Sequence, residues 1–389
     1  MTTQQKHHYK YFLVTVLFFG IATALFRGIL DNYLAEILQV SKANRGILEF
    51  FRELPGLFLV VLLALFYRTP ENRILTIGYV IAFIGVVGFM VAGENLIPAV
   101  ILLMVWSTGQ HLIMPVRQSF MVHSVEKGNE GKALGTLRSF QSIGQVAGYL
   151  IVPLIFFFVS GIEGYHISFY LIIALVGCAV LFSLRLKQTG EKIKRQRIYF
   201  NRKYNKYYLL QSFYGARKQV FLTFGPYVLI LMYSTSAATI ATLMGICAAL
   251  NIFISPQIGK IIDKIGYKKV MVGDTIILFF VCLVYGFAHH VFSPDVAYIA
   301  VVIVFILDRL LSNASMAGSV YVKALSDDRE EMTATLTTGL SIDHLISIFI
   351  ALGGGLIWEH FGIEMLFISA GVMALANSAV ALTVKVVKR

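Results

Sequence analysis

Long apolar runs alternate with short polar breaks along almost the whole chain. An α-helix needs about 20 apolar residues to cross the roughly 30 Å hydrocarbon layer of a bilayer, and twelve runs reach this length. The first six cover residues 11–38, 46–67, 74–93, 97–122, 133–160 and 166–186, and the others cover 207–233, 238–257, 270–291, 296–322, 333–358 and 364–384. The pattern predicts an all-α integral membrane protein of twelve transmembrane helices in two groups of six.

One long polar segment, residues 187–206, separates the two groups. Its sequence, KQTGEKIKRQRIYFNRKYNK, holds eight Lys and Arg residues against one acid, Glu191. Short loops rich in Lys and Arg stay on the cytoplasmic side of a membrane. We therefore expect a basic cytoplasmic connector between an N-terminal bundle over residues 1–186 and a C-terminal bundle over residues 207–389.

The charges of the remaining loops agree with this topology. On the connector's side, the loops and the tail carry Arg68, Arg73, Lys127, Lys132, Lys260, Lys264, Lys268, Lys269, Arg329, Lys385, Lys388 and Arg389. The opposite loops carry mainly acids, namely Glu94, Glu163, Asp295, Glu359 and Glu364, with Lys42 and Arg45 as exceptions. Both termini are therefore predicted to be cytoplasmic.

Composition excludes the soluble classes of protein. The chain is 57% hydrophobic and 14% charged, with a mean hydropathy of +0.75, which is too apolar for a soluble protein of this length. The formal charge of +12 lies mainly in the predicted cytoplasmic loops, so anionic lipid headgroups, and not nucleic acid, are its expected partner. We expect no disulfide, metal or cofactor, because the three cysteines lie in apolar runs and His289 and His290 show no further ligands in the sequence.

The two groups of helices also repeat one another weakly. A shift of about 200 residues places residues 121–140 on residues 321–340, and each segment is a helix end, a charged loop and a small-residue helix start. Six plus six helices in a parallel repeat is the plan of secondary transporters, which hold substrate between their halves near the bilayer midplane. The repeat predicts alternating access by rocking of one half against the other.

The loop after the second helix of the second half reads GKIIDKIGYKK from Gly259. It resembles the loop signature of the major facilitator superfamily, Gly-x-x-x-Asp-Arg/Lys-x-Gly followed by basic residues, although Tyr267 takes a place where that family usually has a base. The resemblance implies a gating role for Asp263, with Gly259 and Lys264 in the same motif. The alternative is a plain helix end, with an acidic cap and basic residues anchored at the headgroups. The equivalent loop of the first half has lost the signature.

Three glycines, Gly135, Gly144 and Gly148, reproduce on the fifth helix the spacing of the family's antiporter signature. The signature's Gly-Pro pair is missing, since Tyr149 stands in the proline's place. The glycines indicate either antiport or simply close helix packing. The resemblance covers the whole chain as architecture and identifies no subfamily.

Charged residues inside a bilayer are costly and mark functional sites by default. Toward the outer leaflet, Arg27 and Asp31 share a face of the first helix, and the second helix carries Glu49, Arg52 and Glu53. We interpret this mixed cluster either as an outer gate or as a static structural lock.

A second set lies deeper and comes from both halves. Its members are the substrate-binding candidates Gln110, Arg117, Arg138, Gln141, Gln145, Arg217, Lys218 and Arg309, together with His111, Asp308, Asp343 and His344. Five cations against two acids favour an anionic or zwitterionic ligand. The alternative is that the acids neutralise two cations while the others extend to the inner headgroups.

Coupling to protons requires a group whose pKa can move into the physiological range. The pair Asp343 and His344 is the first candidate, followed by His111 and Asp31.

We therefore expect a monomeric, multi-pass secondary transporter of the inner or plasma membrane that moves a small organic anion or zwitterion with protons. No Walker-type loop is present to drive it with ATP. The first alternative is a proton-driven exporter of lipophilic drugs that uses Asp31. The second is a receptor or sensor that kept the fold and lost transport. An enzyme is not expected, because no catalytic spacing stands out.

Overall fold

The computed structural model describes residues 3–66, 68–92, 95–125, 130–187, 199–327 and 329–386, and this part of the chain is helical and contains no β-strand. The first half forms α1 (Thr3–Asn32), the π-helical turn η1 (Tyr33–Ile37), α2 (Lys42–Leu57), α3 (Leu59–Leu65), α4 (Glu71–Ala92), α5 (Leu96–His123), α6 (Glu130–Phe158) and α7 (Ile162–Ser183). The second half forms η2 (Arg202–Tyr204), α8 (Asn205–Tyr233), α9 (Ala237–Ile265), α10 (Tyr267–Val291), α11 (Pro294–Leu311), η3 (Ser312–Ser315), α12 (Met316–Leu325) and α13 (Arg329–Leu382).

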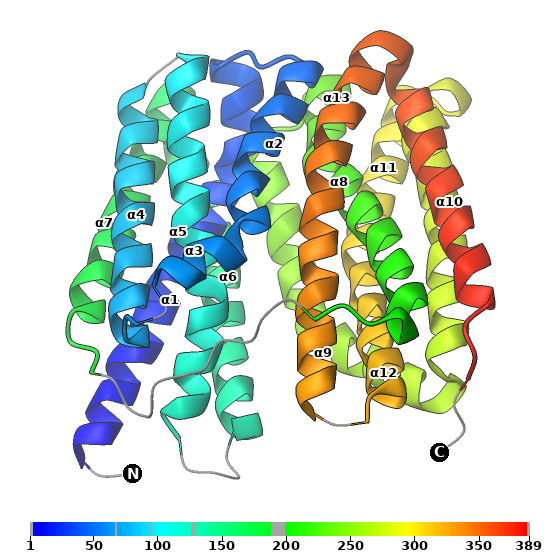
Figure 1. The fold of residues 1–389 in the computed structure, drawn as a ribbon. Coiled ribbons are helices and arrows are strands. Elements are labelled where there is room, and N and C mark those ends of the chain that lie inside the picture. The colour runs from blue at the N-terminus through cyan, green and yellow to red at the C-terminus, as the bar shows by residue number, and fades with distance from the viewer. Residues whose placement is uncertain are drawn as a thin grey trace. The chain divides into compact units, whose positions relative to one another are not determined.

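The twelve predicted helices are confirmed, with three irregularities. The second run is divided into α2 and α3 at Phe58, and the tenth is divided into α11 and α12 by the 3-10 turn η3. The last two runs appear as α13, which bends sharply at Gly362, where φ is +88° and ψ is 169°. Figure 1 shows this bend as the turn between the orange and red parts of α13.

Eight helices of the described chain are long and apolar enough to cross a membrane: α1 with η1, α4, α5, α6, α7, α9, α10 and α13. The other predicted spans are α2 with α3, α8, and α11 with α12, which are either broken or rich in polar residues. Polar groups inside a bilayer bundle need partners or a cavity. These less apolar helices are therefore the expected location of a functional site.

The chain forms two compact units. The first comprises Met1–Gln39, Phe51–Arg195 and Ser236–Ala249, and the second comprises Val40–Phe50, Gln196–Thr235 and Leu250–Arg389. This division differs from the predicted bundles at two short segments, because 40–50 groups with the second unit and 236–249 with the first. Rocking of the halves remains a prediction.

The first unit is built around α1, which packs against α6 and α7, and around the close pair α4 and α5 (Figure 1). Aromatic rings fill its core, since Phe26 lies 4.8 Å from Trp106 and Phe19 lies 5.0 Å from Tyr79 between ring centroids. Such tilted and edge-to-face pairs add to the dispersion gained by packing.

Replacing Gly148 with alanine is expected to destabilise the first unit by about 1–3 kcal/mol, the usual cost of overpacking. A Cβ at Gly148 would meet the carbonyl oxygen of Ile21 and lie 2.8 Å from the Cβ of Ala24 on α1. Thermal unfolding in detergent measures the loss. Gly135→Ala is the matched control on the same helix, because nothing lies within 4 Å of a Cβ there. Equal unfolding temperatures for the two variants would contradict this packing role.

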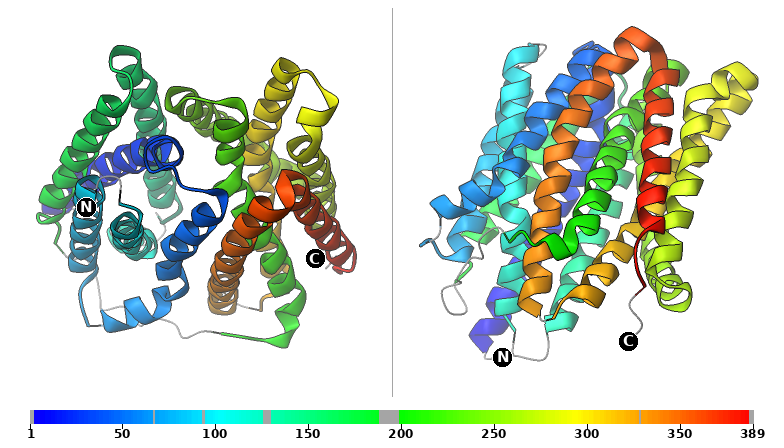
Figure 2. Two further views of the ribbon diagram at one scale, coloured as in Figure 1. Left: turned by 90° about the horizontal axis from the view of Figure 1, so that it is seen from above. Right: turned by 45° about the vertical axis from the view of Figure 1, so that its right-hand side comes forward.

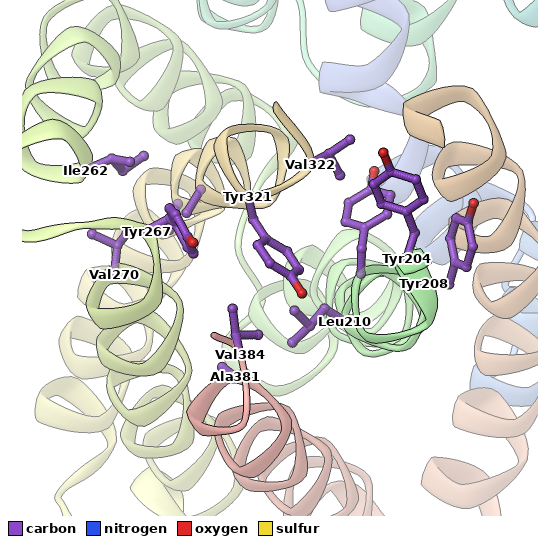
Figure 3. Close-up of a cluster of buried hydrophobic side chains, with 13 residues drawn as sticks. Tyr204, Tyr208, Leu210, Ile262, Tyr267, Val270, Tyr321, Val322, Ala381 and Val384 are labelled. Carbon is purple, nitrogen blue, oxygen red and sulfur yellow. The ribbon is translucent and has the colours of Figure 1, made fainter. Parts of the chain in front are cut away.

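The second unit is built around α8 and α13, which run side by side in Figures 1 and 2, and α10 packs on α13. One end of this unit has a buried, tyrosine-rich core, of which Tyr204, Tyr208, Tyr267 and Tyr321 are labelled in Figure 3. Tyr321 of α12 and Tyr267 of α10 have ring centroids 5.5 Å apart. This cluster joins α8, α10, α12 and the end of α13 beside the polar residues described below.

The last part of the basic connector is attached to this same unit. Lys203 donates to Asp327 over 2.8 Å, and this hydrogen bond raises the pKa of Lys203 above its ordinary value. The hydroxyl of Thr338 donates to the carbonyl of Tyr199 over 2.6 Å. Four other basic residues of the connector, Lys192, Lys194, Arg195 and Arg197, lie outside the described residues, as do Lys127 and Glu94.

Candidate functional site

Two adjacent cations, Arg217 and Lys218, lie near the middle of α8. Successive residues of an α-helix project about 100° apart, so the two side chains reach different neighbours. Arg217 forms an ion pair with Asp274 of α10, and Lys218 forms one with Asp343 of α13.

The Arg217 pair is the more deeply buried. Its side chains are 5% exposed for Arg217 and 10% for Asp274. A second acid, Asp308 of α11, is also buried and acts electrostatically on the same guanidinium. One delocalised cation thus faces two carboxylates, an arrangement that suits the several donors of arginine.

The Lys218 pair is more accessible. The ammonium nitrogen lies 2.5 Å from Oδ2 of Asp343, and the side chains are 23% and 6% exposed. Gly215, on the preceding turn of α8, lets α13 come close, since a Cβ there would lie 2.6 Å from Oδ1 of Asp343. The hydroxyl of Ser347 also donates to the carbonyl of Gly215 over 3.3 Å. A lysine with one accessible side can exchange its partner more readily than the enclosed arginine.

Three polar atoms of these pairs are buried without a hydrogen-bond partner among the described residues: Nη2 of Arg217, Oδ1 of Asp274 and Oδ1 of Asp343. A buried polar atom that makes no hydrogen bond costs about 1–3 kcal/mol. The set includes a cationic donor and two anionic acceptors. It can therefore bind groups of either sign, or water.

A pocket lies beside Asp274 inside the second unit, with about 40 Å³ of room for water-sized groups. A cavity needs roughly 10–15 Å³ on this measure to hold one water. Its lining includes Tyr207, Gln211 and Tyr214 of α8 and Asn377 of α13. The amide of Gln211 donates to the hydroxyl of Tyr207 over 2.7 Å. Aromatic faces, amides and a carboxylate therefore meet at one place.

Asp274 is the residue of this site that sequence reasoning missed. It lies at the beginning of the predicted run 270–291, where acids are ordinary helix-end residues. The structure begins α10 at Tyr267, which puts Asp274 two turns into the helix. A signal was available in the sequence, because Asp274 lies inside an apolar run of the same half that carries the cations Arg217 and Lys218.

Asp274 also corrects the predicted excess of cations. In the inner part of the second unit, the cations Arg217, Lys218 and Arg309 face the acids Asp274, Asp308 and Asp343. The guanidinium of Arg309 lies 5.2 Å from the ring centroid of Phe305. Among these six described residues the charges balance, so the predicted surplus of cations over acids is not found here.

The first unit holds a partly buried cation, Arg117, with a neutral partner. Nε of Arg117 donates to the side-chain oxygen of Gln141 over 2.8 Å and Nη1 over 3.0 Å, with the amide in the orientation that its surroundings require. Gln110 donates to the hydroxyl of Thr23 over 3.5 Å. The predicted site residues Arg138 and Gln145 are exposed. Of the substrate-binding candidates predicted in the first half, Arg117 and Gln141 are the two that the structure brings into contact with each other.

His111 is a buried histidine with local partners. Its Nδ1 lies 3.1 Å from the hydroxyl and 2.9 Å from the carbonyl oxygen of Ser107, one turn earlier on α5. The Ser107 hydroxyl donates to the carbonyl of Arg52, whose guanidinium pairs with Glu53 over 2.5 Å. This chain of contacts joins α5 to α2.

Glu49 has partners in the second unit. It accepts from Arg45 over 2.9 Å and from the amide of Gln219 over 2.9 Å, and Gln219 also donates to Thr223 over 2.7 Å. Arg45 was expected in a loop, and the structure buries it in α2. On α1, Asp31 is buried whereas Arg27 is exposed.

The remaining predicted residues lie as follows. His344 is buried next to Asp343 on α13. Asp263 and Lys264 are exposed in the last turn of α9, before Gly266 with its φ of +88°, and nothing lies within 4 Å of a Cβ at Gly259. Their roles in coupling and gating remain predictions.

Comparison with solved structures finds many similar folds with different cargoes. The nucleoside transporter NupG, in a mutant form, matches with a TM-score of 0.79 and 15% identity over 96% of this chain and 99% of that one. An auto-inhibited POT family peptide transporter matches with a TM-score of 0.77 and 11% identity over 98% of each chain. A bacterial homologue of the iron transporter ferroportin matches with a TM-score of 0.76 and 12% identity over 98% of this chain and 99% of that one. At these identities the likeness shows the fold alone.

No curated protein matches the chain by sequence. A family model does: the model of the Major Facilitator Superfamily covers residues 12–319, which is most of the chain and includes α8, α10 and α11. The family model, the helix order and the solved folds agree, and the chain belongs to the Major Facilitator Superfamily.

Proposed function

We propose that this protein is a proton-coupled secondary transporter of a small organic zwitterion or anion. Membership of the Major Facilitator Superfamily makes it a multi-pass membrane transporter rather than an enzyme. The substrate class, the coupling ion and cytoplasmic termini are the parts that we propose.

The observation that carries the proposal is the partly buried ion pair between Lys218 and Asp343. A carboxylate paired to a lysine keeps its charge, and it gains affinity for a proton once the lysine turns to another anion. A substrate carboxylate that binds Lys218 would therefore favour protonation of Asp343. Exchange of the anionic partner at Lys218 would therefore couple binding of the substrate to binding of a proton, with no further group required.

The Arg217 pair supports a substrate that also carries a positive charge. Asp274 lines the pocket, and its Oδ1 is buried without a hydrogen-bond partner in the described chain, so an ammonium or amide group of a ligand has an acceptor available here. Donor and acceptor positions of both signs favour a zwitterion over a lipophilic cation. The tyrosines and amides of the pocket suit a polar solute with a flat or hydrophobic part.

Arg117 supports the anionic part of the proposal in the first unit. Its described hydrogen-bond partner is the neutral amide of Gln141, so the guanidinium retains a net charge in a helix that crosses the membrane. An anion would relieve the cost of that charge. The solved folds that resemble this one include a peptide transporter, and a peptide with free termini carries charges of both signs.

Uptake into proteoliposomes tests the substrate class. Labelled amino acids, short peptides, nucleosides, organic anions and a lipophilic cation are offered with and without an inward proton gradient. We expect accumulation of a zwitterion or an anion only when the gradient is present. Uptake of the lipophilic cation alone would support the drug exporter, and binding without any uptake would support a receptor.

Lys218→Gln should weaken binding of the transported solute at least about tenfold, since losing one partner of a charged hydrogen bond costs about 2–5 kcal/mol. Binding of labelled solute to purified protein measures the affinity. Lys206→Gln is the matched control, because Lys206 lies at the start of the same helix and donates to the carbonyl of Thr383. Unchanged affinity in Lys218→Gln would remove Lys218 from the substrate site.

A further inference from the structure

A cluster of metal-binding side chains lies at the end of the second unit where α10 and α11 are joined. His289 and His290 occupy the last turn of α10, and Glu364 follows the bend of α13. Nε2 of His290 lies 2.7 Å from Oε1 of Glu364, and Nε2 of His289 lies 3.2 Å from the same oxygen. One ligand atom from each residue lies within 4.8 Å of the others.

We propose that His289, His290 and Glu364 bind a divalent transition-metal ion of the zinc class. Two imidazole nitrogens and one carboxylate oxygen form a donor set that zinc uses in sites with an open coordination position. The sequence showed the two histidines without a third ligand. The fold supplies that ligand from 74 residues farther along the chain.

The backbone holds Glu364 in place for this role. Gly362 adopts a φ of +88°, which L side chains rarely adopt, and a Cβ there would lie 2.6 Å from Oε2 of Glu364. Glycine at this position therefore permits both the bend of α13 and the position of the carboxylate. Figure 1 shows the same turn at the top of α13, between its orange and red parts.

Next to the cluster, α10 and α13 pack closely enough to keep its geometry. A Cβ at Gly286, one turn before His290, would lie 3.6 Å from the Cα of Glu364. The rings of Tyr285 and Phe367 stack with centroids 4.7 Å apart. Ligands on rigid elements bind metal better than ligands on loops, because less order has to be created on binding.

Access also suits an ion from the solvent. The side chains are 24% exposed for His289, 57% for His290 and 31% for Glu364, which leaves room for water to complete a tetrahedral site. Nδ1 of His289 is buried without a hydrogen-bond partner among the described residues. Its ring is therefore oriented by the nitrogen that faces Glu364. The loops at this end are those predicted to face away from the cytoplasm.

Cobalt(II) and zinc(II) titrations of the full-length protein test the proposal. The protein is purified in detergent through an affinity tag without histidine, since a polyhistidine tag would bind the same ions. We expect one zinc per protein by calorimetry, and visible absorption of tetrahedral cobalt that zinc displaces. Zinc should also raise the unfolding temperature, and the rise should grow with the logarithm of the free zinc concentration once the site is filled.

Variants separate this site from adventitious binding. Glu364→Gln keeps a hydrogen-bonding side chain but removes the anionic ligand, and His290→Ala removes one nitrogen. Each should weaken zinc binding by about tenfold or more and abolish the thermal shift, whereas His166→Ala, a histidine of the first unit, should change neither. Absence of saturable binding, or equal binding in Glu364→Gln and the unmodified protein, would overturn the proposal and leave a hydrogen-bonded tie between two helices.

Discussion

Asp343→Asn is expected to abolish proton-driven accumulation while exchange of substrate across the membrane continues. Asparagine cannot take up and release a proton, so a pH gradient has no group on which to act at this position. A gradient of one pH unit supplies about 1.4 kcal/mol per proton, or about a tenfold concentration ratio. In proteoliposomes, the accumulation ratio of the variant should fall to about one.

The exchange assay serves as the folding control in this experiment, because a misfolded variant would lose exchange as well. Asp295→Asn provides the matched substitution at an exposed acid in the first turn of α11 and should behave like the unmodified protein. His344→Gln tests the neighbouring candidate. If Asp343→Asn still accumulates substrate, the coupling group is elsewhere, and Asp31 and His111 become the next residues to test.

Arg217→Gln should destabilise the protein by about 3–5 kcal/mol, the usual effect of removing one partner of a buried ion pair. The variant would leave Asp274 and Asp308 buried without the cation that they share. Asp274→Asn should also destabilise the protein. The double variant Arg217→Gln with Asp274→Asn should recover much of the loss, because it leaves no uncompensated charge between α8 and α10.

Thermal unfolding of the purified protein in detergent, followed by size-exclusion recovery, measures these three variants. The interaction between the two sites is the difference between the double variant and the sum of the single ones. Lys203→Gln is the control for loss of a paired cation at an exposed position, where ion pairs contribute little. Additive losses in the double variant would show that Arg217 and Asp274 do not stabilise one another.

These experiments distinguish two roles that the sequence could not separate. Arg217 and Lys218 are neighbours in the chain and were expected to act together on the substrate. The structure buries Arg217 in its ion pair with Asp274 and leaves Lys218 partly exposed. We therefore expect mutation of Arg217 to act mainly on stability and mutation of Lys218 mainly on binding and coupling.

The glycines of α6 show how one sequence pattern can have two meanings. Gly135, Gly144 and Gly148 have the spacing of a transport signature, but two of them lie against α1. A Cβ at Gly144 would be 3.0 Å from the carbonyl oxygen of Leu17, and Gly135 has open space around it. Close packing of α1 and α6 is thus a sufficient reason for Gly144 and Gly148, and the antiport hypothesis has no separate support from them.

Sequence alone determined the helices of this protein, because the bilayer imposes a simple rule on every span. A helix that crosses hydrocarbon must be about 20 residues long and mostly apolar, so counting apolar runs located the twelve spans. The family resemblance at Gly259 rested on a short local motif, which needs no knowledge of distant contacts. The irregular positions, Phe58, η3 and Gly362, changed helix boundaries without changing their order.

Only the tertiary structure decided which charges meet. Asp274 lies 57 residues from Arg217 and Glu364 lies 74 from His290, and no local periodicity connects such pairs. Ion pairs and metal ligands act over a few ångströms, so their partners depend on how the helices rotate and pack. Glycines permit the close approach at two such places, Gly215 and Gly362. The sequence determined where polar groups enter the membrane, and packing of the helices determined which of them neutralise each other and which stay open to a ligand.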